Sequence, residues 1–154
     1  MLLLQFQAGS ERFGLEVSRV IEVAPLVILR KIPHTADHIA GLFNYRGTLV
    51  PVIDLTVLLT GAVSQLLMST RIILVHYNGA DGASHILGLL AEGVTETVVC
   101  RPSDLQPPVI SVAGAPYLGM ILLEDRNTLQ CIEIDKLLPD DLQASLFPPI
   151  EASP

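Results

Sequence analysis

Residues 32–55 read IPHTADHIAGLFNYRGTLVPVIDL, and this stretch decides the fold. Its second half indicates two short strands, Phe43–Tyr45 and Leu49–Leu55, joined at the dipeptide Arg46-Gly47. Glycine adopts backbone angles that other residues resist, so it suits a tight turn between two paired strands. Because the flanking apolar side chains are needed in the core, the arginine at this turn is expected to project from the surface.

Short extended segments continue on both sides of this stretch. Glycine, proline, asparagine and aspartate repeatedly interrupt apolar, β-branched runs, a pattern typical of an all-β protein. Helical structure is expected in three places: a turn over 35–40, a short helix within 60–70 and a C-terminal helix over 135–146. The other strands are expected at 2–7, 12–17, 18–23, 28–32, 71–77, 85–90, 94–100, 117–123 and 128–134.

The length and the strand count together predict the domain organisation. A chain of 154 residues has room for one domain of two small lobes. Two groups of about five strands favour two β-barrels over one sandwich, because a closed barrel has no exposed edges. The 26 leucines would fill a core shared by the lobes. We therefore expect one domain over 1–150, with a connector near 60–70 and a disordered tail at 151–154.

The composition excludes several classes of protein. With 50% hydrophobic residues the chain would collapse rather than stay disordered. Its most apolar stretch, 49–59, is interrupted by Pro51 and Asp54 and is shorter than the roughly 18 residues that a spanning helix needs. The first five residues lack the positive charge of a signal peptide. We therefore expect a cytoplasmic protein that does not insert into a membrane.

The charge distribution argues against nucleic acid as a partner. Residues 78–154 hold 3 of the 9 basic residues and 11 of the 16 acidic ones, and no basic stripe is present to meet phosphates. The two cysteines, Cys100 and Cys131, stand in apolar strand-like runs. In the cytoplasm they are expected to be buried free thiols rather than a disulfide.

Residues that carry catalysis are sparse in the sequence. His34 and His38 are four residues apart, but the stretch lacks the His-Glu-x-x-His pattern of a zinc-binding helix. Asp54 is a lone carboxylate at a strand end, where it is expected to accept backbone hydrogen bonds. No catalysis, metal or cofactor is therefore expected. The alternative from another functional class is a metal-dependent hydrolase that uses His34, His38 and Asp54.

The stretch 32–55 resembles the signature of CheW-like chemotaxis coupling proteins. That signature is a proline, a short helical turn, Gly-x-x-Asn-Leu-Arg-Gly and then x-x-Pro-x-x-Asp-Leu. Residues 6–23, 87–98 and 117–138 are similar to other segments of the family, so the resemblance covers 2–146. It implies two five-stranded SH3-like barrels around a common hydrophobic core, with no catalytic activity.

The resemblance also implies two partners and a contact surface. Members of the family bridge the cytoplasmic tip of a chemoreceptor to the regulatory domain of a CheA-type histidine kinase, which is itself built like CheW. Kinase contact is expected on strands of the second lobe. An apolar floor in a groove between the lobes would take the receptor's helical tip, and a charged pair would set its register. The receptor-contacting positions would be Val20, Glu22, Gly41, Arg46, Gly47, Ile72 and Ile73, with Val20, Ile72 and Ile73 as the floor and Arg46 and Glu22 as the pair.

The sequence departs from the family pattern at two places. Tyr45 stands where leucine is usual, and Ala91-Glu92 stands where Val-Asp is common. The variant Tyr45-Arg46-Gly47 and the acidic second half favour a coupling protein of a non-flagellar pathway, such as a Wsp-type surface-sensing system. A regulatory domain detached from a larger kinase would share the fold, and Met1 opening directly into the first strand favours the free-standing adaptor.

Overall fold

A computed structural model describes residues 1–124 and 127–148 of the chain. The expected tail at 151–154 and residues 125–126, between the strands expected at 117–123 and 128–134, lie outside the described residues. In the described part of the chain, ten strands account for about half of the backbone, and the all-β expectation is confirmed.

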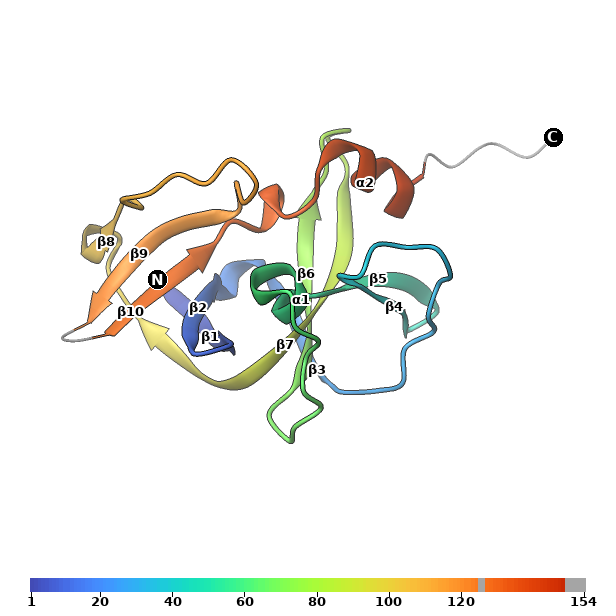
Figure 1. The fold of residues 1–154 in the computed structure, drawn as a ribbon, viewed down its shortest axis with the longest axis horizontal. Helices are drawn as coiled ribbons and strands as arrows, with labels where there is room; N and C mark the ends of the chain where they lie inside the picture. The colour runs from blue at the N-terminus through green and yellow to red at the C-terminus, as the bar shows by residue number, and fades with distance from the viewer. Residues whose placement is uncertain (125–126, 149–154) are drawn as a thin grey trace.

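The elements follow one another in the order of their labels (Figure 1), and the longest connections are 26–38, 61–70 and 107–117. The strands are β1 (Leu2–Ala8), β2 (Glu11–Glu16), β3 (Val20–Pro25), β4 (Ile39–Tyr45), β5 (Thr48–Asp54), β6 (Arg71–Asn78), β7 (Ser84–Val99), β8 (Leu105–Gln106), β9 (Leu118–Glu124) and β10 (Asn127–Ile132). The helices are α1 (Leu55–Thr60) and α2 (Asp140–Leu146), with 3-10 turns η1 (Val17–Arg19), η2 (Pro102–Asp104) and η3 (Ile134–Lys136).

The strands form two lobes that share one long strand, β7. Residues 84–91 of β7 pair with β6, and residues 92–99 pair with β1. Lobe A has the strand order β7-β1-β2-β10-β9-β8, and lobe B has the order β3-β6-β7-β5-β4. In Figure 1 lobe A lies on the left and β4 and β5 of lobe B lie on the right. The expected fold of two small β-lobes with a short C-terminal helix is therefore confirmed.

The two lobes do not correspond to the first and second halves of the chain. The strands expected at 85–90 and 94–100 are one continuous strand, which bends near a register shift opposite residues 5–7 of β1. Lobe A combines the N-terminal hairpin with the C-terminal strands β8 to β10, whereas β3 to β6 belong to lobe B. Residues 61–70 connect α1 to β6. The strand before α1, β5, and the strand after the loop, β6, both belong to lobe B.

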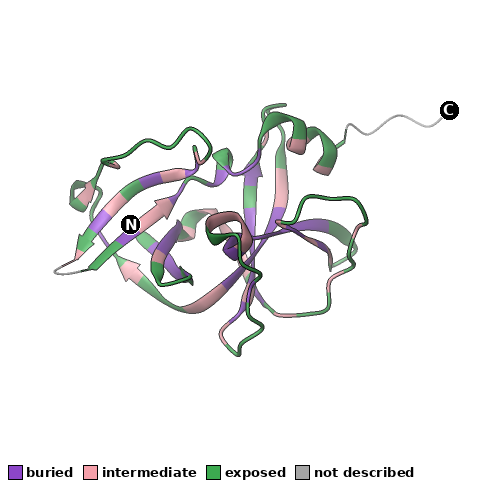
Figure 2. Ribbon diagram, in the orientation of Figure 1, coloured by how far each residue is buried: buried purple, intermediate pink, exposed green. Residues whose placement is uncertain are grey.

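Three apolar clusters stabilise this arrangement. The largest joins the two lobes and includes Phe6 from β1 and Ile73 and Tyr77 from β6, all with no exposed surface. A second cluster around Ile72 fills lobe B, and a third around Leu3 fills lobe A. Each such large side chain contributes about 1.5–3 kcal/mol on burial. Figure 2 shows the buried segments concentrated on the central strands. The expectation of a core shared by the lobes is confirmed.

The helical turn expected over 35–40 is wrong. Thr35 does not cap a helix, because its hydroxyl donates to the carbonyl oxygen of Ile32. His34 has a φ of 62°, which is outside the right-handed helical region. The segment makes turns only, and β4 begins at Ile39. The strand expected at 28–32 is reduced to a single bridge between Arg30 and Leu42.

The helix expected within 60–70 is wrong, because residues 61–70 form only bends, turns and irregular backbone. A short helix lies instead at 55–60, because the Asp54 side chain accepts from the backbone N–H groups of Thr56 and Val57 and so starts α1 directly after β5. The helix expected over 135–146 begins only at Asp140, after η3.

Candidate functional site

The turn between β4 and β5 presents an arginine in a strained backbone conformation. Arg46 and Gly47 have φ values of 51° and 87°, as a two-residue hairpin turn of the primed type requires. The left-handed region costs a residue with a side chain about 1–2 kcal/mol. Gly47 donates its backbone N–H to Asn44 Oδ1 at 2.9 Å, which stabilises the turn. The expected hairpin is confirmed, and its tip holds Arg46 outward.

The Arg46 side chain is exposed but has two neighbours. It keeps 77% of its surface accessible, as expected for a projecting side chain. Its Nη2 atom lies 3.6 Å from Glu22 Oε1 on β3, and its guanidinium carbon lies 5.2 Å from the centroid of the Tyr45 ring. Exposed ion pairs contribute little to stability, so these contacts mainly orient the guanidinium. The structure thus brings together the two charged residues of the expected contact surface.

Gly41 has a structural reason to be glycine. It is buried in β4 at a register shift, and a β-carbon there would lie 2.6 Å from the carbonyl oxygen of Arg30. The same Arg30 carbonyl accepts the N–H of Leu42 at 2.8 Å. Gly41 therefore allows the segment after β3 to pack against β4. It lies beneath the surface rather than on it.

Two of the three residues expected to form the apolar floor of the receptor groove are not exposed at the surface. Ile72 and Ile73 have no exposed surface, because β6 lies inside the sheet and both of its faces are covered. Val20 is half-buried against the cluster between the lobes. Next to Glu22, it is Val23 on β3 that is exposed, by 40%. Val23 pairs with Ile73 of the cluster between the lobes and Glu22 pairs with Leu74 of the lobe B cluster, so the two side chains lie on opposite faces of β3 and Arg46 contacts only Glu22 of the two.

A second surface feature is an apolar cleft of about 810 Å³ in lobe B. It lies between the segment 26–40 and the loop after α1, with Ile28, Val63 and Leu66 on its rim. Ile28 is 99% exposed, and the two loop residues are also exposed. Apolar side chains gathered on the surface mark interaction sites. Sequence reasoning missed this cleft, because the apolar residues of 61–70 were expected to form a short helix rather than a loop with exposed side chains.

Asp54 at the cleft is occupied by hydrogen bonds of its own. It is 4% exposed and, besides starting α1, accepts from the backbone N–H and the hydroxyl of Ser64. This confirms the expected role as a backbone acceptor. Neither Asp54 with His34 and His38 nor any other group of three His, Cys, Asp or Glu within the described residues could hold a metal ion. The metal-dependent hydrolase therefore finds no support.

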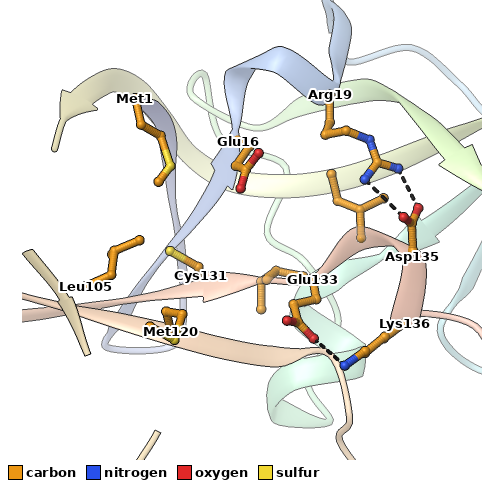
Figure 3. A pocket seen from close by; sticks show the side chains of 11 residues that line it. Met1, Glu16, Arg19, Leu105, Met120, Cys131, Glu133, Asp135 and Lys136 are labelled. Atoms are coloured by element: carbon orange, nitrogen blue, oxygen red, sulfur yellow. Dashed lines mark hydrogen bonds and ion pairs between the residues drawn. The ribbon is translucent and has the colours of Figure 1, made fainter. Parts of the chain in front are cut away.

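A smaller pocket of about 300 Å³ lies where η1, β10 and η3 meet (Figure 3). Two ion pairs cross its wall: Arg19 to Asp135 and Lys136 to Glu133. Burial raises the pKa of the Cys131 thiol to about 11, so this sulfur stays protonated near neutral pH. A protonated thiol is a poor nucleophile. Both cysteines are free thiols, as expected.

Comparison with known proteins agrees with this architecture. The CheW-like domain family matches residues 2–142. Chemotaxis protein CheW of Klebsiella aerogenes is 26% identical, over 92% of this chain and 83% of that protein, and Chemotaxis protein CheW of Treponema pallidum is 26% identical, over 88% and 80%. The crystal structure of scaffolding protein TtCheW from Thermoanaerobacter tengcongensis superposes with a TM-score of 0.77 at 28% identity and covers 88% of this chain and 86% of that one. No helix among the described residues is long and apolar enough to cross a membrane. The chain belongs to the family of CheW-like domains.

Proposed function

We propose that the protein is a non-catalytic adaptor in chemotaxis-like signalling that couples the cytoplasmic tip of a chemoreceptor to the regulatory domain of a CheA-type histidine kinase. Family membership and the chemotaxis relatives support the signalling role. The observation that carries the proposal is the pair of separate contact surfaces on one fold. The first is the charged tip of the β4–β5 hairpin, and the second is the apolar cleft of lobe B.

The two surfaces are far enough apart for two partners. β5 begins beside the turn at Thr48 and ends at Asp54, which lines the cleft. Six residue steps of about 3.3 Å separate these ends by roughly 20 Å. One partner at the Arg46 tip therefore leaves the Asp54 end of the cleft accessible to another, whereas the opposite end begins at Leu26, close in sequence to Glu22. This geometry suits a bridge between two proteins that act in the cytoplasm.

The charged part of the receptor surface consists of Glu22, Arg46 and Gly47, and Val20 and Val23 lie on the opposite face of the same strand, β3. Gly41, Ile72 and Ile73 are buried and support the strands from within. A carboxylate on the helical tip of the receptor would meet the guanidinium of Arg46. Charge pairing at the rim then sets the register of the helix.

The kinase surface is the apolar rim of the cleft. Kinase contact was expected on strands of the second half of the chain, which carry the exposed Val99 and Leu123 in lobe A. We favour the cleft because it combines a hollow with exposed apolar side chains, and buried apolar anchors in such hollows dominate interface energies. The departures from the family pattern further favour a receptor of a Wsp-type surface-sensing pathway.

Binding of a receptor fragment tests the first contact. Arg46→Glu should leave the fold intact, because the side chain is at an exposed turn, and should weaken binding by at least about 1 kcal/mol, the scale of a lost interfacial charged contact. The measurement is calorimetric titration with a soluble helical hairpin that carries the receptor tip. Normal binding by folded Arg46→Glu protein would contradict the assignment.

A matched pair of variants tests the proposed contact between the cleft and the kinase regulatory domain. Leu66→Asp should abolish capture of the kinase regulatory domain, because it places a charge on the apolar rim. Val99→Asp places the same charge on an equally exposed valine of lobe A and should leave capture unchanged. If Val99→Asp alone abolishes capture, the kinase contact lies on lobe A instead. Capture followed by mass spectrometry from a native lysate would identify the cognate receptor and kinase.

A further inference from the structure

Tyr45, the residue before Arg46, stands where the family pattern has leucine. Its contacts in the structure indicate a role for this difference. The Tyr45 ring stacks on Phe43, with 6.3 Å between centroids and 24° between planes. Both rings are half-buried against the cluster that fills lobe B. The ring of Tyr45 is therefore fixed by packing from one side. Its other neighbour is the guanidinium of Arg46.

This ring restricts a side chain that would otherwise be mobile. A surface arginine has many rotamers, and a partner that binds it must select one of them. Here the guanidinium is 5.2 Å from the ring centroid and 3.6 Å from Glu22 Oε1. A guanidinium over an aromatic face is attracted by the ring quadrupole. Leucine, the usual family residue at this position, has no such face.

We infer that Tyr45 is a positioning residue that holds the Arg46 guanidinium ready for a carboxylate on the receptor tip. This inference rests on the proposed function for its partner. The separation of 3.6 Å from Glu22 is longer than a hydrogen bond, so that contact orients the guanidinium without using its N–H donors. The planar fork of guanidinium donors matches a carboxylate. The partner group is therefore an acidic side chain near the end of the receptor hairpin.

The positioning is measurable without any partner. In an NMR spectrum the Nε–H resonance of Arg46 should carry an upfield ring-current shift. Tyr45→Phe keeps the ring and should keep this shift, whereas Tyr45→Leu should lose it. Tyr45→Met serves the same purpose if the leucine variant does not fold. An unchanged resonance in a folded variant without the ring would overturn the inference.

A double-mutant cycle measures the consequence for binding. Tyr45→Leu should weaken binding of the receptor hairpin about three- to tenfold, the effect of one side chain left unfixed, and Tyr45→Phe should restore it. In an Arg46→Lys background the same leucine substitution should have little effect, because the stacked planar group is already gone. A purely structural role for Tyr45 would instead make the two losses multiply, and the inference would fall.

These experiments distinguish a failure of this inference from a failure of the proposed function. If the wild-type protein does not bind the receptor hairpin at all, the receptor role fails, while the Arg46 resonance still decides whether Tyr45 positions the guanidinium. If the wild type binds and Tyr45→Leu binds equally well, the receptor role stands and the inference fails.

Discussion

Single side chains fix the local structure around both surfaces, and Asp54 has the largest influence. Its two carboxylate oxygens end β5, start α1 and hold Ser64 of the following loop. The sequence predicted the acceptor role, because an aspartate after an apolar strand has few other partners. It could not predict Ser64, since a contact ten residues away depends on the path of the loop.

Removing this carboxylate should destabilise the fold. Asp54→Ala leaves several buried donors without an acceptor and removes a helix cap, so we expect a loss of about 2–4 kcal/mol in the free energy of unfolding. Urea denaturation measures it. Asp54→Asn keeps one acceptor oxygen and should lose less. A loss below about 0.5 kcal/mol for the alanine variant would show that the loop does not depend on this residue.

Asp135 predicts an acid-dependent part of the stability. Desolvation raises its pKa, but hydrogen bonds from Arg19 and from the backbone and side chain of Asn78, with the charge of Arg19, outweigh this and lower it. A lowered folded-state pKa stabilises the protein above the unfolded value of about 3.9, and this contribution is lost as the pH falls through the folded value. Because the side chain is 41% exposed, the contribution is at most about 1 kcal/mol.

The measurement is the free energy of unfolding as a function of pH for wild type and Asp135→Asn. The variant should be less stable at neutral pH and should show a smaller decrease in acid. Parallel curves for the two proteins would be inconsistent with a native Asp135 carboxylate held by Arg19.

At the scale of elements, the loop 61–70 depends on the strands around it. Glu92 on β7 accepts from the Thr56 hydroxyl at 2.8 Å and from the backbone N–H of Gln65 at 3.1 Å. One carboxylate of the bent strand thus ties α1 and the loop together. The longer side chain in place of the family's aspartate therefore has a structural use in this protein.

Shortening or removing this side chain should loosen the loop. Glu92→Ala leaves the Gln65 N–H without its acceptor, so its hydrogen exchange should become at least tenfold faster, equivalent to about 1.4 kcal/mol. Glu92→Asp should fall between wild type and alanine. Exchange measured by NMR checks both, with the N–H groups of β6 as an internal control. Equal exchange at Gln65 in all three proteins would mean that the loop is held by other contacts.

Elements were predictable where periodicity distinguishes one structure from another. The hairpin was predicted with strands at 43–45 and 49–55 because these apolar runs flank an Arg-Gly turn, although its first strand begins earlier, at Ile39. The burial of Ile72 and Ile73 was missed although the continuous apolar run 72–75 is the pattern of a strand covered on both faces, because the family resemblance placed both residues on the contact surface. The continuity of β7 was also missed, since glycine and glutamate inside an apolar segment resemble a turn signal.

At the scale of the whole molecule, the lobes are joined through one core and one strand. The cluster between them contains residues of both lobes, among them Leu15 of β2 and Leu89 of β7. Two lobes and a shared core could be predicted from strand count and leucine content. Which segments belong to which lobe could not, because pairing between chain ends is non-local and leaves no trace in short patterns.

Because the two lobes share one core and one strand, we expect the protein to unfold in a single transition. Leu89→Ala should lower the free energy of unfolding by about 2–5 kcal/mol, because the residue is fully buried between the lobes. NMR signals from lobe A and lobe B should be lost at the same urea concentration. Val99→Ala, at an exposed position of the same strand, should cost less than about 0.5 kcal/mol. Separate midpoints for the two lobes would contradict the shared core.

The shared β7 strand also limits how such a protein can change over evolution. Lobe A is assembled from both ends of the chain, and lobe B lies between them in the sequence. Recombination cannot exchange lobe A as one contiguous gene segment, and removal of lobe B would remove half of the strand that lobe A needs. New partner specificities on lobe A must therefore arise by substitution in place rather than by exchange of one contiguous segment.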